Sequence, residues 1–184
     1  MNQDIGRAIV FSMPVVSAAV SLILISLDTT RSSNTVDRKI HYNMIAVYCL
    51  MILFWSGLVM HSIARDTFIA YLPVFFSSFA FIPVFLYRIT HIITDTGERK
   101  LFPACHFILP ACLTLIICAI ALAVPLRQRW AAIYDNEVNL TSAIIDITFI
   151  VCILLCILYS WLSLLRIKSY KRKIIDYSAD IYRM

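Results

Sequence analysis

The chain has few glycines and few charged residues. Only three glycines, Gly6, Gly57 and Gly97, occur among 184 residues. A membrane β-barrel needs many turns and strands of alternating polarity, and the sequence shows neither pattern. Charged residues make up 15% of the chain and hydrophobic residues 61%, with a mean hydropathy of +0.83. This balance is too apolar for a soluble domain of this length and predicts a helical integral membrane protein.

Sequence signatures of enzymes and metal sites are also missing. The chain contains no H-E-x-x-H, no G-x-S-x-G and no P-loop. Its six cysteines lie in or beside apolar runs and lack the spacings of zinc sites. Cys152 and Cys156 share a helix face, and we expect them to pack as small hydrophobic side chains. We therefore predict no catalytic residue, no metal ligand and no cofactor.

Five long uncharged runs dominate the chain, and only Asp146 interrupts one of them. Each run is long enough to cross a hydrocarbon core of about 30 Å as a helix, which takes roughly 20 residues. Inside lipid, a helix is the structure that pairs every backbone group within its own segment. The predicted fold is an all-α, polytopic integral membrane helical bundle over residues 1–166, followed by a tail over 167–184. The predicted spans are 8–27, 42–64, 67–87, 101–126 and 138–165.

Lysine and arginine are unevenly distributed between the two sides of the predicted bundle. Twelve lie in the loops after spans 1 and 3 and in the tail, and four lie on the other side. Because basic residues concentrate on the cytoplasmic side, this bias predicts an outer N-terminus and an inner C-terminus. It also explains the net charge of +5 better than nucleic-acid binding does. The predicted location is the bacterial inner membrane, as a multi-pass protein.

Several residues at the ends of the spans carry further expectations. Spans 2 and 3 are joined almost directly by residues 64–66, which predicts a tight antiparallel hairpin on the outer side. Trp130 and Tyr134 are expected at the outer interface, where amphipathic rings are favoured.

The prolines of spans 3 and 4 are expected to kink their helices; these are Pro73, Pro83 and Pro110. The histidines are expected to be interfacial rather than metal ligands; His41, His91 and His106 lie on the inner side and His61 on the outer side.

Asp146 is the one charged residue inside a predicted span. An acidic group in lipid is costly unless it faces protein, water or a partner, so Asp146 is a candidate functional residue. The alternative is that Asp146 lies near the outer interface, where the first turn of a helix favours negative charge. Thr141 or Ser142 would then be the N-cap.

The tail carries an apolar stripe beside a basic cluster. The stripe has a heptad-like 3, 4, 3, 4 spacing that continues the last helix; its members are Ile167, Tyr170, Ile174, Tyr177 and Ile181. The basic cluster is Lys171, Arg172 and Lys173. Such a face docks either onto anionic lipid or onto a partner helix, and both readings stay open.

Two stretches resemble a known family. These are IPVFLYRITHIITDTGERKLFPACHFILP (82–110) and YKRKIIDYSAD (170–180). They resemble the membrane portion of the membrane-anchored AraC-type transcription regulators of the Bacteroides group. The resemblance implies several N-terminal membrane helices followed by two more helices and a cytoplasmic helix-turn-helix domain. Because this chain ends at Met184, the expectation is a truncated or stand-alone version with no direct nucleic-acid binding.

The leading functional hypothesis is therefore a non-enzymatic membrane sensor or anchor of a transcription regulator. The expected partners are the lipid bilayer and either further copies of this chain or a membrane partner protein. The alternative is a small transporter or channel subunit that works as an oligomer around Asp146.

Overall fold

The computed structural model describes residues 2–31, 35–94, 102–135 and 139–181, and within these ranges the chain forms helices and no strand. The helices are α1 (Asn2–Arg31), α2 (Thr35–Ile63), α3 (Arg65–Ile93), α4 (Ile108–Ala123), α5 (Leu126–Tyr134) and α6 (Leu140–Ile181). A single-turn 3₁₀ helix, η1 (Ala104–Phe107), precedes α4. The predicted all-α class is confirmed.

Five of these helices are long and apolar enough to cross a membrane. They cover Asp4–Thr30, Thr35–Ile63, Arg65–Ile93, Ala104–Ala123 and Leu140–Ile175. Large apolar side chains on their outer surfaces stay exposed; Leu24 on α1 and Leu154 on α6 are 63% and 57% exposed. A soluble helix would turn a polar face outward instead, so these surfaces suit contact with lipid.

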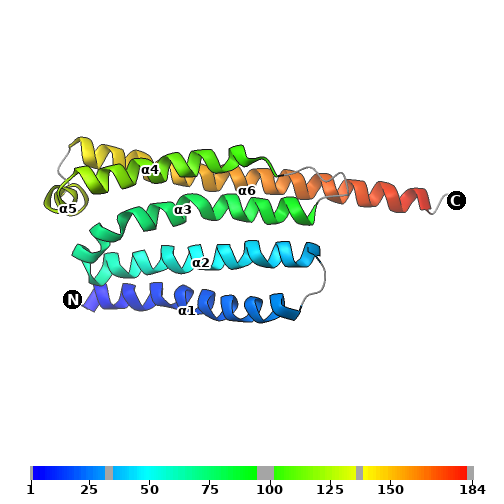
Figure 1. Cartoon of the computed structure of the whole chain (residues 1–184), viewed down its shortest axis with the longest axis horizontal. Coiled ribbons are helices and arrows are strands. Elements are labelled where there is room, and N and C mark those ends of the chain that lie inside the picture. Colours follow the sequence, from blue (N-terminus) through cyan, green and yellow to red (C-terminus); the bar gives the residue numbers. More distant parts are fainter. Residues whose placement is uncertain (1, 32–34, 95–101, 136–138, 182–184) are drawn as a thin grey trace.

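α3 is the central helix of the bundle. Helices α1, α2 and α3 lie side by side in a row, and α4 and α6 lie together on the other side of α3 (Figure 1). Ten residues of α3 are buried, more than on any other described helix. Phe75 and Phe79 of α3 contact Phe54 of α2, and Phe79 also contacts Phe149 of α6. These rings join three helices into one core.

The predicted hairpin between the second and third spans is confirmed. Only Ala64 separates α2 from α3. The Ala64 N–H donates to the Met60 carbonyl, and the Phe68 N–H donates to the Ala64 carbonyl. Gly57 permits a close approach further along α2, since a Cβ atom there would lie 2.6 Å from the Phe75 ring.

The fourth span differs from its predicted bounds of 101–126. Leu101 lies outside the described residues, and α4 ends at Ala123. The reason is Pro125, which disfavours a helical conformation at Val124; that residue is extended, with φ −102° and ψ 127°. The chain then forms α5, which we did not predict. Pro110 was expected to kink its helix, but it lies in the first turn of α4, where its missing N–H removes no hydrogen bond within α4 itself.

The last span begins at a different cap from the one predicted. Asn139 caps α6, because its Oδ1 accepts a hydrogen bond from the Ser142 N–H at 2.9 Å. The Ser142 hydroxyl in turn accepts from the Asn139 N–H at 3.1 Å. The prediction of Thr141 or Ser142 as N-cap was therefore wrong. From Leu140 the helix continues without a break through Ile181, so the tail extends α6 as expected.

Candidate functional site

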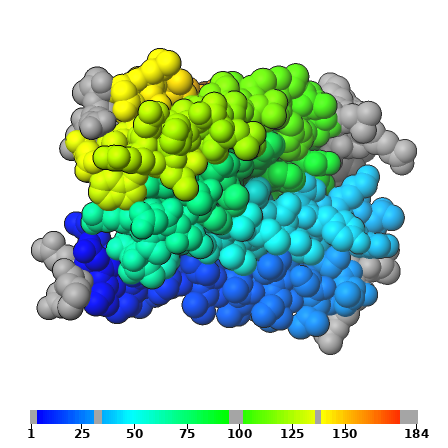
Figure 2. All heavy atoms as spheres, turned by 60° about the vertical axis from the view of Figure 1, so that its left-hand side comes forward, coloured from blue at the N-terminus to red at the C-terminus, as the bar shows by residue number. Residues whose placement is uncertain are grey.

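The short helix α5 organises one end of the bundle. The N-terminus, the α2–α3 connection and α5 all lie at this end, which we call the N-terminal end (Figure 1). Figure 2 shows α5, in yellow-green, packed against the first turns of α3. Trp130 and Tyr134, which were expected at one interface, both lie on α5 with their rings 5.3 Å apart.

Arg129 attaches α5 to α3. Its side chain is only 6% exposed, and its Nη1 donates to the Ile69 carbonyl at 3.2 Å. That carbonyl would normally accept from the residue four positions later, but this residue is Pro73, which has no N–H. The Arg129 Nε donates to the Val124 carbonyl at 3.1 Å, close to the end of α4. One buried guanidinium therefore holds three helices in register.

Tyr134 makes a second attachment between α5 and the α2–α3 hairpin. The Arg65 guanidinium lies over its ring at 5.1 Å from the centroid, and the His61 ring lies 5.4 Å away. Its hydroxyl is buried and has no hydrogen-bond partner among the described residues. Burial raises the pKa of Tyr134 above its ordinary value, and the nearby Arg65 opposes this only in part. Tyr134 is therefore a neutral, ring-packing residue at physiological pH.

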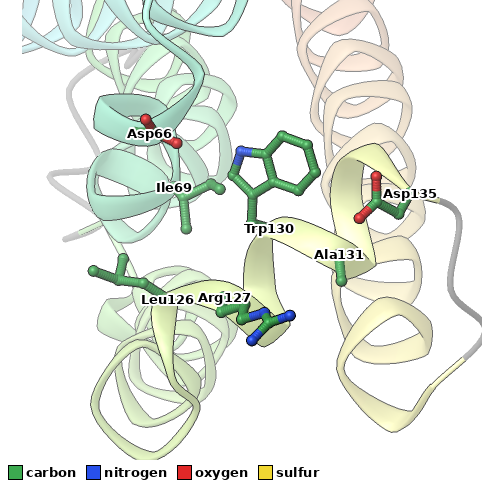
Figure 3. A pocket seen from close by; sticks show the side chains of 7 residues that line it. All are labelled: Asp66, Ile69, Leu126, Arg127, Trp130, Ala131 and Asp135. Carbon is green, nitrogen blue, oxygen red and sulfur yellow. The ribbon is translucent and has the colours of Figure 1, made fainter.

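A pocket of about 490 Å³ opens between α3 and α5. We call it the end pocket; it is lined by Asp66, Ile69, Leu126, Arg127, Trp130, Ala131 and Asp135. Figure 3 shows Asp66 and Asp135 on either side of Trp130, with Arg127 at another edge. These three charged side chains form no ion pair with one another or with any other described residue. The pocket thus combines an aromatic surface with unpaired charges of both signs.

Asp146 lies in a second, smaller pocket of about 230 Å³, which we call the side pocket. Its walls come from α2, α3, α5 and α6 and include His61, Ile133 and Phe149. Asp146 is exposed, and within the described ranges it forms no ion pair. It is in the second turn of α6, beyond the first turn where the helix dipole favours a negative charge most.

An aromatic cluster joins the other end of the bundle to α6. The Tyr159 hydroxyl lies 3.1 Å from His106 Nδ1 and donates to the His106 carbonyl at 3.3 Å. Phe102 packs against both His91 and His106, with centroids 5.5 and 5.0 Å apart. Arg166 Nε donates to the Thr94 hydroxyl at 2.7 Å, next to the end of α3. These contacts hold α6 where it leaves the bundle.

The histidines do not gather into a metal site. His41 lies elsewhere, with its Nε2 3.3 Å from an Asp28 carboxylate oxygen. In the part of the chain that the structure describes, no three His, Cys, Asp or Glu side chains are placed to share a metal ion. Cys152 is fully buried in the hydrophobic core, where it packs as a small apolar side chain as predicted.

The tail carries its stripe on a helix that projects beyond the rest of the bundle (Figure 1). Ile167 and Ile174 are about half exposed, and Lys171, Arg172 and Lys173 are exposed. Tyr170 is partly buried. The side chains of Tyr177 and Ile181 lie outside the described residues, although their backbone belongs to α6. The docking role of the stripe and of the basic cluster stays a prediction.

Sequence reasoning missed the end pocket. Asp66 and Asp135 are 69 positions apart, and nothing in their local sequence relates them. A usable signal was present in LRQRWAAIY (126–134), which follows Pro125 and has the mixed polarity of an amphipathic helix. No protein-family model, curated protein or solved structure matches this chain.

Proposed function

We propose that the chain is a multi-pass membrane sensor that passes a signal from the N-terminal end of the bundle to the tail. In this proposal the N-terminal end faces outward and the tail faces the cytoplasm, as the distribution of lysine and arginine indicates. The hypothesis of a regulator's membrane part agrees with an input pocket at one end and a projecting helix at the other.

The observation that carries the proposal is the continuity of α6. The helix has 42 residues, which at 1.5 Å per residue is about 63 Å, roughly twice the thickness of a hydrocarbon core. Its second turn lines the side pocket with α5, and its last turns project beyond the bundle. A rigid helix transmits a shift or rotation at one end to the other, so movement of α5 would reach the tail.

The tail is better suited to a partner helix than to the membrane surface. A helix that lies on lipid must turn into the plane of the interface. Here α6 runs straight on from the bundle instead (Figure 1). In heptad terms the apolar residues take the a and d positions, while Arg166, Lys171 and Lys173 take flanking e and g positions. The basic charges at 166, 171 and 173 disfavour self-pairing over this part of the tail and favour an acidic partner helix, whereas Asp180 takes a g position near the end of the stripe.

The transporter alternative has less support. Transport sites lie near the middle of the bilayer. Asp146 is 20 residues before Arg166, which binds at the opposite end of α3, and a helix of that length spans about 30 Å. This distance is about the thickness of a hydrocarbon core, which supports the interfacial alternative for Asp146 over a site at mid-membrane.

The test is photo-cross-linking of the tail in native membranes. With a photoreactive residue in place of Ser169, an Ile174→Asp exchange should reduce protein adducts at least about tenfold, since it places a charge in the apolar stripe. The matched control is Ile175→Asp: Ile174 and Ile175 are 50% and 53% exposed, but Ile175 lies off the stripe. Unchanged adducts in the first variant, or equal loss in both, would contradict a docking role. Adducts with lipid alone would do so as well.

A further inference from the structure

The end pocket has the size and chemistry of a small-molecule site. Its volume of about 490 Å³ falls within the range of roughly 300–1,000 Å³ that is usual for such sites. Its lining is mostly apolar and includes Ile69, Leu126 and the Trp130 indole, with a few charged groups at the edges. This combination binds the body of a ligand by burial and orients it by charge.

The charged groups of the pocket specify the charges of its ligand. Asp66 on α3 and Asp135 at the end of α5 lie on either side of Trp130 (Figure 3). A cationic ammonium group that binds one of these carboxylates and lies beside the indole gains both ion pairing and cation–π attraction. Arg127, which has no ion-pair partner among the described residues, is available for an anionic group.

The position of the pocket walls is set independently of any ligand. Arg129, two residues from Arg127 and next to Trp130, is buried and bonded to the Ile69 carbonyl on the opposite wall. Tyr134 is packed against Arg65, next to Asp66. Because these supporting contacts are buried or stacked, they fix the backbone of α5 against that of α3, so binding need not pay to bring the two walls together.

We infer that the end pocket binds a small zwitterion with an apolar body, of the kind that α-amino acids represent. The ammonium group binds Asp66 or Asp135 beside the indole, the anionic group binds Arg127, and the apolar body covers Trp130 and the exposed Leu126. This inference rests on the proposed sensory role, for which it names the input. The same pairing of ammonium and anion occurs in the headgroup of phosphatidylethanolamine, so the bilayer is a second source of this chemistry.

The test compares three probes that share a phenyl group and a short chain. L-Phenylalanine carries both charges, 2-phenylethylamine only the ammonium, and 3-phenylpropanoate only the carboxylate. The full chain is placed in nanodiscs of phosphatidylglycerol, with Trp55 and Trp161 replaced by phenylalanine so that Trp130 is the sole tryptophan. L-Phenylalanine should shift the Trp130 emission saturably, and each single-charge probe should bind at least roughly tenfold more weakly. Equal affinity of the three probes, or no saturable shift, overturns the inference.

Variants separate the pocket from general surface charge. Asp66→Asn combined with Asp135→Asn, and separately Arg127→Gln, should each weaken L-phenylalanine binding by roughly tenfold or more. Asp4→Asn is the control, because this carboxylate lies at the same end of the bundle but outside the pocket. Equilibrium dialysis with radiolabelled L-phenylalanine supplies a readout that does not depend on Trp130. Equal weakening by the control overturns the inference.

The lipid source is tested in discs that contain phosphatidylethanolamine. If the headgroup fills the pocket, these discs should shift the Trp130 emission without added ligand and reduce L-phenylalanine affinity. The shift should be absent in the Asp66→Asn, Asp135→Asn variant, which would confirm the zwitterion chemistry and assign it to lipid. None of these measurements involves the tail. Failed binding with intact tail cross-linking therefore overturns this inference alone, and lost cross-linking with intact binding overturns the proposed signalling role alone.

Discussion

Two prolines each leave a backbone carbonyl without its usual donor, and in both cases a distant side chain supplies the hydrogen bond. Pro73 frees the Ile69 carbonyl, which accepts from Arg129; Pro110 frees the His106 carbonyl, which accepts from Tyr159. In lipid-like surroundings an unsatisfied carbonyl costs several kcal/mol, so these bonds are structurally important. Each one also ties two separate elements together, which makes proline positions into attachment points.

Replacement of Arg129 by alanine should release α5 from α3. Hydrogen bonds from a charged donor contribute about 1.5–3 kcal/mol, so the free energy of opening of α5 should fall by about 2–3 kcal/mol. Amide exchange over 126–134 should then become roughly 30- to 160-fold faster, which hydrogen–deuterium exchange mass spectrometry measures. Arg127→Ala is the matched control, because Arg127 is exposed and makes no hydrogen bond to α3. Equal acceleration in both variants would show that Arg129 is not the attachment.

At the scale of elements, α3 determines how the other helices pack. It contacts α2 on one side and both α4 and α6 on the other. α2 approaches α3 closely at Gly57, where the Phe75 ring occupies the space that a side chain would need. Small residues have this role in membrane bundles, because they let backbones approach and gain van der Waals contact.

Gly57→Ala should therefore weaken the α2–α3 contact. The added methyl group must displace the Phe75 ring, which stacks on Phe54 with centroids 5.0 Å apart. We expect a loss of about 1–3 kcal/mol in the free energy of unfolding, measured by titration with sodium dodecyl sulfate in mixed micelles. Gly6→Ala is the control, since no atom lies within 4 Å of the added Cβ. That variant should be neutral or more stable by up to about 1 kcal/mol, because alanine is the better helix former. A Gly57 variant as stable as the Gly6 variant would contradict the close-packing role.

At the scale of the whole molecule, apolar surface and charge are separated along the long axis. Exposed isoleucine and leucine side chains surround the middle of the bundle, and the end pocket and the tail hold charged residues at its two ends. This distribution is compatible with either orientation of the protein in a bilayer. The distribution of basic residues predicts the direction with the tail inside.

Cysteine labelling in intact cells that express the protein tests this orientation. With the six native cysteines replaced by alanine, Gln128→Cys on α5 should react with a membrane-impermeant maleimide before lysis. Ser169→Cys on the tail should react only after lysis, because the maleimide cannot cross the membrane that holds the protein. Both positions are exposed, so differences in burial do not interfere. The reverse pattern would show the opposite orientation and would contradict an outward-facing end pocket.

The sequence by itself determined the helical class, the five apolar segments and the hairpin at Ala64. Long uncharged runs separated by charges allow one solution, since each backbone group must find its partner within its own helix. The continuation of α6 into the tail also followed from local spacing, because the apolar stripe keeps a helical period through Ile174.

Only the tertiary structure decided which side chains meet. Asp66 and Asp135 share a pocket because Arg129 finds the carbonyl that Pro73 leaves free, and this depends on how α5 folds back onto α3. Likewise, Tyr159 reaches His106 across 53 positions of the chain. Such contacts depend on packing between elements, which local spacing does not encode, whereas the class and length of each helix depend on hydrogen bonds within it.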